Sequence, residues 1–453
     1  MRLSTILSIV FIVITVQSAN SQTSIGFKNP ENTKPLLDYR LPTWGYRTLT
    51  FDFSFSGSRD YQEFNNGLQK SNKSMSLALH FNPAYVFYYE SEKNISNINI
   101  RISGSNNHIN EKNDYKNRTH EYKYDYMIAI YSASFQTKHY ITNQSFFSIS
   151  GESSGDYRER DSETINSGND IQNTSEWSGY LNRNYNSDVK MGFGFGRVRN
   201  VAPVIRALRL NERLAAVEKD RTINADEVQE IARTIAKNSG YQSVYQRESK
   251  YFWNDVFKPI AKLDPLTPFE VLYFSEIISE TIGSRYEGWD AAAGLDFIYD
   301  YYKESEKCEK MLGAFTQARF FHNISLSKQI SLKATFEWYK PLINKENFPA
   351  TMNIDLNCNY LWCLADRVLW NSSITFKYCN EKNSEISPES KLIFTNTIFQ
   401  TSLSYFIEDN LSFSTSINWN LNYYDQTSNT SNKYISRLSS NMGLTYYFDR
   451  TLF

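Results

Sequence analysis

The sequence of 453 residues predicts an all-β transmembrane fold, an antiparallel β-barrel of about 14 strands with an α-helical periplasmic insert. Three observations predict it: long runs that alternate apolar and polar residues, turns that are alternately short and long, and one segment with helical periodicity. Aromatic residues make up 15% of the chain although its mean hydropathy is only -0.53. Such aromatic content argues against disorder. A net charge of -1 gives no electrostatic basis for nucleic-acid binding, so we expect none.

The chain begins with a pattern typical of a secretory signal peptide. Arg2 supplies a positive charge, an apolar run follows at 7–16, and Ala19-Asn20-Ser21 offers small residues for cleavage. We therefore expect residues 1–21 to be removed on export, rather than 7–16 to form a buried strand. No later stretch approaches the ~18 apolar residues of a membrane-spanning helix, so any membrane crossing is expected to use strands.

Strands are indicated from about residue 47 onward by period-two alternation. Leu49, Phe51 and Phe53 alternate with polar residues, and the run 411–423 alternates in the same way. The alternation of Tyr122 and Tyr124 with charged neighbours is interpreted likewise. These runs last 9 to 14 residues. Strands of soluble sandwiches usually have ~5–6 residues, whereas a membrane-crossing strand needs ~9–11. The apolar face is therefore predicted to face lipid and the polar face a lumen.

The turns between these runs alternate in length. Short turns are predicted at 90–94, 137–140, 327–329, 365–367 and 408–410. Long loops are predicted at 57–72, 105–118, 153–183, 303–312, 341–350, 380–390 and 425–432. The barrel is divided into about six strands in 22–199 and about eight in 286–453. An even number places both chain ends on the periplasmic side, and closure is expected because lipid offers no partner for an unpaired strand edge.

On these alternating runs, at about 47–199 and 286–453, the sequence resembles bacterial outer-membrane β-barrel proteins of porin-like type. Its richness in Asn, Lys and Tyr is similar to that of AT-rich Gram-negative bacteria. The resemblance identifies no narrower family. It implies that the protein is located in the cell outer membrane and is surrounded by outer-membrane lipid.

Residues 200–285 are predicted to form the helical insert. Only four of the 44 Asn lie within 201–284, and a stripe with period 3.6 begins at Ala207. Capping boxes at Asn224–Glu227 and Thr267–Glu270 start two helices, and an aromatic-rich helix is expected at 251–260. Four helices with apolar faces predict a small periplasmic bundle, either beneath the barrel mouth or plugged into it.

The candidate functional residues are the polar members of the alternating runs, which would give the lumen a wall of mixed charge. They are Asp290, Asp296, Asp300, Lys333, Glu337, Asn353, Asp355 and Asn357. Gly192, Gly194 and Gly196 precede the insert but lack the spacing of a phosphate-binding loop. We interpret them as inward positions without side chains, which make room in the lumen beside the insert.

Other polar groups have two interpretations each. Arg206, Arg209 and Arg213 could bind an anionic partner, but a solvated helix face paired with Glu212 is favoured. A solvated face is also preferred over a metal site for Glu276 and Glu280 because no His lies within reach.

No motif predicts catalysis, so we expect neither an enzyme nor a cofactor. Alternation places His322 and Ser325 on opposite faces of a strand, which argues against a hydrolytic pair. Core or lumen thiols are the default interpretation of Cys308, Cys358, Cys363 and Cys379.

Two functions follow from these observations. The first is a channel or uptake pore for polar solutes, since fourteen strands enclose more space than eight. The second is a structural or assembly barrel without an open pore, whose insert at 201–284 docks a periplasmic protein. A soluble sandwich is a third possibility.

Overall fold

The computed structural model describes residues 32–63, 69–115, 118–168, 171–217, 223–260, 266–280, 282–302, 307–343, 350–365, 368–383, 390–408, 411–426 and 433–446. The predicted signal peptide at 1–21 lies outside these residues. No helix within the described ranges is long and apolar enough to span a bilayer.

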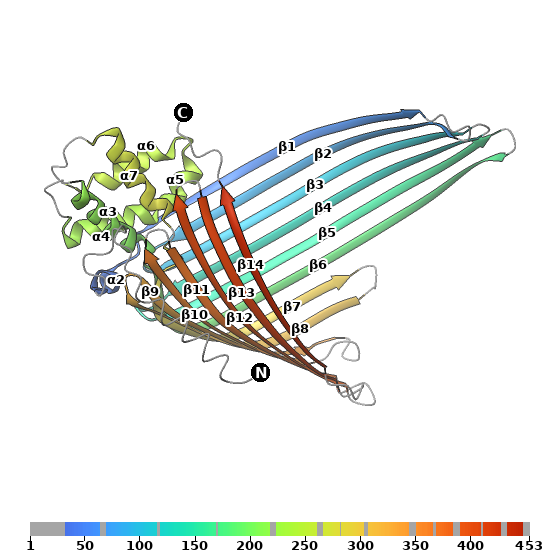
Figure 1. Cartoon of the computed structure of the whole chain (residues 1–453). Coiled ribbons are helices and arrows are strands. Elements are labelled where there is room, and N and C mark those ends of the chain that lie inside the picture. The colour runs from blue at the N-terminus through green and yellow to red at the C-terminus, as the bar shows by residue number, and fades with distance from the viewer. Residues whose placement is uncertain are drawn as a thin grey trace.

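The described chain forms one antiparallel sheet of fourteen strands, in which each strand pairs with the next along the sequence. The strands are β1 Trp44–Glu63, β2 Gln69–Glu90, β3 Asn94–Tyr115, β4 Arg118–Tyr140, β5 Ser145–Gly168, β6 Ile171–Asn200, β7 Tyr286–Tyr302, β8 Lys307–Ser325, β9 Lys328–Pro341, β10 Ala350–Ala365, β11 Val368–Asn383, β12 Ser390–Glu408, β13 Leu411–Gln426 and β14 Lys433–Tyr446. The predicted all-β class and strand count are confirmed. Figure 1 shows that the sheet is strongly curved, with the helices gathered at one end.

The first six strands are much longer than the alternation predicts. They have 20 to 30 residues, against 14 to 19 in β7–β14, and project beyond them (Figure 1). The segments predicted as long loops at 57–72, 105–118 and 153–183 are therefore mostly strand. We call this projecting part of β1–β6 the distal extension. Outside the tyrosine stripe of β4, the segments predicted as loops carry mostly polar residues on both faces, so the hydrophobic alternation is lost there while the hydrogen-bond ladder continues.

The stripe of Tyr122 and Tyr124 belongs to the distal extension. Because β4 runs without interruption and side chains alternate along it, these tyrosines share a face with Lys138. In the part of the sheet outside the distal extension, this face is the polar one. The interpretation of this stripe as lipid-facing is therefore wrong. The tyrosines lie on the same face as Lys138, and in the distal extension of β4.

The opposite face carries a continuous apolar belt, defined here as the exposed apolar side chains that the strand register places on one side of the sheet. At one edge Leu49, Phe51 and Phe53 are 59%, 62% and 67% exposed, and at the other Leu438 and Met442 are 72% and 78% exposed. Between them the belt continues through Phe81, Ile102, Phe135, Phe193, Leu295, Leu312, Leu332, Phe336, Leu356, Ile374, Tyr405 and Ile417. Soluble monomers rarely expose a contiguous apolar surface this extensive.

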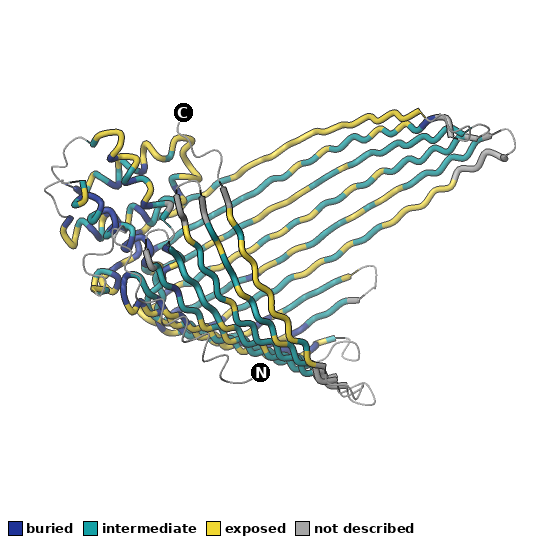
Figure 2. Tube along the Cα trace, viewed as in Figure 1, coloured by how far each residue is buried: buried dark blue, intermediate teal, exposed yellow. Residues whose placement is uncertain are grey.

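The two edges of the sheet are β1 and β14. Their described residues are not paired to each other, so closure of the barrel stays a prediction. Both strands are exposed along nearly their whole length, as Figure 2 shows for β1 and β14. Because the strand number is even, β1 and β14 run in opposite directions, which is the orientation that an antiparallel closing pair requires.

The helical insert lies between β6 and β7. Its helices are α3 Ala202–Ala216, α4 Ala225–Ala236, α5 Asn238–Val244, α6 Glu248–Phe257 and α7 Pro268–Ser279, and a short helix, α2 Lys34–Asp38, precedes the sheet. The insert is thus helical as predicted, with α5 as a fifth, short helix. Its core includes Leu210, Ile231 and Phe274, which cluster with Leu36 of α2 and Leu326 of the β8–β9 turn.

This packing fixes the insert at the end of the sheet that carries the turns 91–93, 141–144 and 326–327, which we call the short-turn end. Arg285, 1% exposed, follows the insert and donates hydrogen bonds to the carbonyls of Ile282 at 3.0 Å and Ser327 at 2.7 Å. The bundle is therefore held against the sheet by packing and hydrogen bonds, and not only by its chain connections to β6 and β7.

Both predicted capping boxes are formed. The Asn224 side chain accepts a hydrogen bond from the Glu227 amide at 2.9 Å, and the Glu227 carboxylate accepts one from the Asn224 amide at 3.0 Å. Thr267 and Glu270 make the same pair of bonds at the start of α7.

Replacing Asn224 by alanine is expected to destabilise the insert by about 1 kcal/mol, because α4 loses its N-cap acceptor. Urea unfolding followed by circular dichroism measures the change. Gln242→Ala, at an exposed position of α5, is the control and should alter stability by less than about 0.5 kcal/mol. Equal losses in the two variants would contradict the capping role.

Candidate functional site

The polar face of the sheet, opposite the apolar belt, brings together the residues predicted to line a lumen. Directly opposite residues in an antiparallel pair point to the same side. The register places Asp290 opposite Arg319, Arg319 opposite Lys333, and Lys333 opposite Asn357. Parity along each strand adds the other predicted residues to this face: Asp296, Asp300, Glu337, Asn353 and Asp355. All eight therefore share one surface, which we call the polar wall.

A first charge cluster on the polar wall centres on Asp290, which is 4% exposed. The Arg319 guanidinium donates to both of its oxygens, with Nε at 2.8 Å from Oδ1 and Nη2 at 2.6 Å from Oδ2. Lys138 Nζ donates to Oδ2 at 2.7 Å from β4. One buried carboxylate thus holds two cations and links β4, β7 and β8 across the inside of the curve.

A second cluster lies further along β7 and centres on Lys190 of β6. Its Nζ is 2.9 Å from Glu337, 3.3 Å from Asp296 and 3.6 Å from Asp188. Asp296 is fully buried and also accepts a hydrogen bond from the Tyr339 hydroxyl at 2.6 Å. A single ammonium group is therefore surrounded by three carboxylates, which leaves this part of the wall acidic.

The remaining predicted residues make lighter contacts. Asp300 accepts a hydrogen bond from Asn186, Asp355 pairs with Lys377 at 3.6 Å, and Asn357 donates to the Thr375 hydroxyl at 2.8 Å. Lys333 Nζ lies 5.8 Å from the ring centre of Phe321. Asn353 stands opposite Glu337 in the register.

The arrangement presents charges of both signs, fixed by mutual ion pairs, along one continuous surface. Buried ion pairs hold their members in place because an unpaired charge in this setting is costly. The wall therefore presents ordered donors and acceptors at successive levels along the strands.

The three glycines lie on the same wall, but the space above them is filled by the sheet itself. A Cβ at Gly194 would meet the ring of Phe146, and one at Gly192 would lie 3.1 Å from the ring of Phe315. Gly196 has φ +98° and borders Trp289. The nearest atoms to these glycines thus belong to strands, so the interpretation that they make room for the insert is wrong. Aromatic rings of β5 and β8 use that room.

The predicted pairing of the α3 arginines with Glu212 is formed, because Arg209 Nη1 donates to the Glu212 carboxylate at 2.8 Å, but the face is not solvated. Arg209 and Arg213 are 2% and 6% exposed and face into the insert. Both pair with Glu280, at 3.2 Å and 2.7 Å, and Arg213 also pairs with Glu276 at 3.1 Å. The ion pairs of Arg209 and Arg213 thus join α3 to α7, which excludes a solvated face or a partner-binding role for them and a metal-binding role for Glu280. Arg206 is partly buried, and burial lowers the pKa of its guanidinium.

His322 and Ser325 do not cooperate. His322 Nδ1 is 3.3 Å from Glu287, whereas Ser325 is buried and bonded to the hydroxyl of Ser327 at 3.1 Å. All four cysteines are free thiols. Cys379 lies on the polar wall and Cys358 is exposed on the opposite face, so the default interpretation as core or lumen thiols does not hold for Cys358.

Sequence reasoning missed the partners that complete the wall. Lys138, Lys190 and Arg319 stand at polar positions of alternating strands, so the same parity rule that selected Asp290 could have selected them. Tyr339 could not have been found in this way, because an aromatic residue at an inward position carries no polar signal until Asp296 is placed beside it.

Comparisons with known proteins assign no family. No protein-family model matches the chain, and no curated protein matches it. Among solved structures, OccAB3 of Acinetobacter baumannii aligns over 89% of this chain and 98% of its own, with 8% identity and a TM-score of 0.23. The translocator domain of the autotransporter NalP from Neisseria meningitidis aligns over 92% of both chains, with 8% identity and a TM-score of 0.17.

A third solved structure is the beta domain of the Bordetella autotransporter BrkA, which aligns over 89% of this chain and 99% of its own. Its identity is 7% and its TM-score 0.17. At these values the alignments assign neither a family nor a function to the chain.

Proposed function

We propose that the protein is an outer-membrane β-barrel that forms a channel or uptake pore for polar solutes, without catalytic activity. The observation that carries the proposal is the division of the sheet into two continuous faces. The apolar belt spans the strands from β1 to β14, and the polar wall lies on the other face. Lipid outside and solute inside is the arrangement that these two faces suit.

Closure of β1 against β14 is part of the proposal. Both edges carry the same outward stripe, with Phe51 and Phe53 on β1 and Met442 and Leu444 on β14. Their opposite faces include polar residues such as Asp52 and Ser54 on β1 and Ser439 and Asn441 on β14. Antiparallel pairing of these edges would join the belt to itself and remove the unpaired backbone groups that a lipid environment penalises.

The insert supports a second candidate function, an assembly barrel that docks a periplasmic protein. Phe269 and Leu272 on α7 are 70% and 43% exposed, and Tyr251 on α6 is 47% exposed. These side chains lie at the short-turn end, outside the apolar belt, where a partner protein would have access to them. In this reading the bundle blocks the lumen and no current flows.

Planar-bilayer conductance of the full chain and of a variant in which a short polar linker replaces residues 202–279 separates the two functions. A pore predicts stepwise currents from the full chain, and larger currents from the linker variant if the bundle obstructs the mouth. A folded state is established first by heat-modifiable mobility in gels. If neither folded protein conducts, the channel proposal fails and the assembly barrel is favoured.

A further inference from the structure

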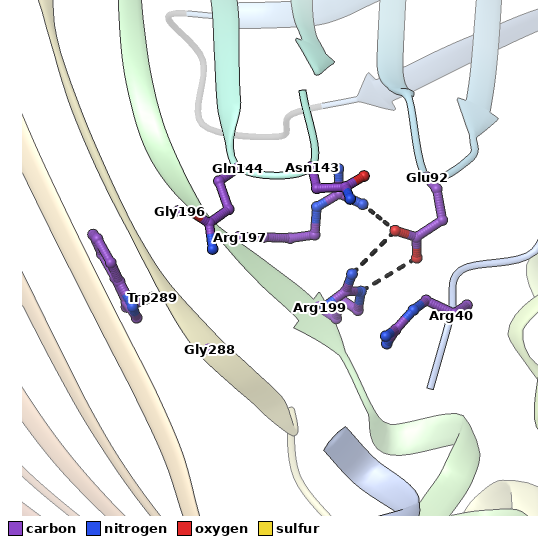
Figure 3. Close-up of a pocket in the computed structure, with 9 residues that line it drawn as sticks. All are labelled: Arg40, Glu92, Asn143, Gln144, Gly196, Arg197, Arg199, Gly288 and Trp289. Atoms are coloured by element: carbon purple, nitrogen blue, oxygen red, sulfur yellow. Dashed lines mark hydrogen bonds and ion pairs between the residues drawn. The ribbon is translucent and has the colours of Figure 1, made fainter. Parts of the chain in front are cut away.

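A pocket with a cavity volume of about 340 Å³ lies at the short-turn end and borders the polar wall at Gly196. It is lined by Arg40, Glu92, Asn143, Gln144, Gly196, Arg197, Arg199, Gly288 and Trp289. These residues come from the segment before β1, the β2–β3 and β4–β5 turns, the end of β6 and the start of β7. Figure 3 shows the Arg197 and Arg199 side chains reaching Glu92, with Arg40 beside them but not bonded to it.

The pocket has a surplus of positive charge. Three arginines and one carboxylate line it, so the formal charge of its lining is +2. Glu92 accepts hydrogen bonds from Arg197 and from Arg199, the latter at 3.2 and 3.1 Å. Burial raises the pKa of Glu92, but hydrogen bonds from Arg199 and the Leu41 amide, with the arginine charges, outweigh it and lower that pKa below its usual range. Glu92 therefore stays ionised at neutral pH and offsets one of the three arginine charges.

Arg197 has one buried donor that is not used. Its side chain is 8% exposed, and its guanidinium lies 3.8 Å from the ring centre of Tyr140. Its Nε is buried and has no hydrogen-bond partner among the described residues. A buried, charged donor without an acceptor is costly, and an anion in the cavity would supply the acceptor.

Two glycines keep the wall of the pocket free of side chains. Gly196 has φ +98° and Gly288 has φ +106°, conformations that residues with a Cβ rarely adopt. A Cβ at Gly288 would also lie 2.2 Å from the Arg197 carbonyl oxygen. Neither position could therefore carry a side chain without a shift of the neighbouring strand.

The position of the pocket favours a lipid source for that ligand. Trp289 forms one wall, is 49% exposed, and packs against Phe195 of the apolar belt with ring centres 5.8 Å apart. The pocket thus lies at the boundary between the belt and the short-turn end, where head groups would be found if the proposed membrane location holds. Arginine forks match the oxygens of phosphate, and tryptophan is enriched at this level of a bilayer.

We propose that this pocket binds a phosphate group, supplied by the head group of a phospholipid in the leaflet at the short-turn end. The claim that a phospholipid supplies the phosphate rests on the proposed membrane function. The claim that the pocket binds phosphate rests on the arginines alone, and it is tested in detergent, where no pore activity is needed.

The test uses the full chain purified in a phosphate-free, non-ionic detergent. Inorganic phosphate binding is measured by calorimetric titration, and phospholipid retention by native mass spectrometry after exposure to vesicles of phosphatidylethanolamine and phosphatidylglycerol. Arg199→Gln and Arg40→Gln are each expected to weaken binding about tenfold, the effect of losing one charge-assisted hydrogen bond. Arg40 is the safer variant for folding because it precedes β1 and is exposed.

Two further variants sharpen the result. Glu92→Gln removes the internal anion that competes for the arginines, so it should strengthen phosphate binding. Arg59→Gln, an exposed arginine of the distal extension, removes the same charge far from the pocket and should leave binding unchanged. Retained phospholipid that is lost in the pocket variants supports the lipid source, and phosphate binding without lipid retention supports a free anion. Binding of neither probe, or equal loss in Arg59→Gln, overturns the proposal.

Discussion

Replacing Glu280 by glutamine is expected to lower the free energy of unfolding of the helical insert by about 3–5 kcal/mol, the cost of removing one partner from a buried ion pair. Glu280 ends α7, and its two oxygens bond to different arginines of α3. Oε1 accepts from Arg213 Nη2 at 2.7 Å and Oε2 from Arg209 Nε at 3.2 Å. Both guanidinium groups are buried, so water cannot replace the lost charge.

The matched control for this prediction is Glu276→Gln on the same helix. The Glu276 side chain is 56% exposed, and although it pairs with Arg213 at 3.1 Å, solvent screens that pair. Its replacement should cost less than about 1 kcal/mol. Urea unfolding followed by helical circular dichroism gives both values. Equal costs would mean that burial does not set the strength of the α3–α7 connection.

These arginines also show where sequence reasoning about the insert reaches its limit. The spacing of Arg206, Arg209 and Arg213 places them on one helix face, and exposed faces of this kind are common. Spacing within one helix carries no information about what packs against that face. Glu276 and Glu280 belong to α7, about seventy residues further along, so their pairing with the arginines appears only once tertiary packing is known.

The strands were more predictable than the bundle, because alternation and turn length are local signals. Leu49 and Phe51 indicate an apolar face, and the short turns around 365–367 and 408–410 mark where strands meet. The distal extension was missed for the same reason. Its segments at 57–72, 105–118 and 153–183 have mostly polar residues on both faces, so they give no period-two hydrophobic signal although backbone pairing continues, as between Arg160 and Tyr126.

The polar wall was predictable as a face but not as a network. Parity alone assigned Asp290, Asp296 and Glu337 to one side of the sheet, and the register agrees. Which cation serves which carboxylate depends on strand tilt and sheet curvature. Lys190 on β6 therefore meets Glu337 on β9, across two intervening strands, a contact that no sequence pattern records.

Replacing Lys190 by methionine is the second large effect that we expect. The variant removes the only ammonium group that the described residues place within 4 Å of Asp296, which is fully buried. The uncompensated carboxylate should lower the stability of the sheet by about 3 kcal/mol at neutral pH. If the pore forms as proposed, three neighbouring carboxylates without their cation should also raise its preference for cations. Zero-current potentials in a potassium chloride gradient measure that preference.

Lys333→Met separates the two consequences of losing Lys190. It removes the same charge from the same face, but Lys333 lies over the ring of Phe321 and not among buried carboxylates. We therefore expect Lys333→Met to shift the zero-current potential in the same direction while changing the stability by less than about 1 kcal/mol. A large loss of stability in both variants would refute the special role of the Lys190 cluster. An unchanged potential in both, in folded and conducting protein, would show that the polar wall does not line the pathway of the ions.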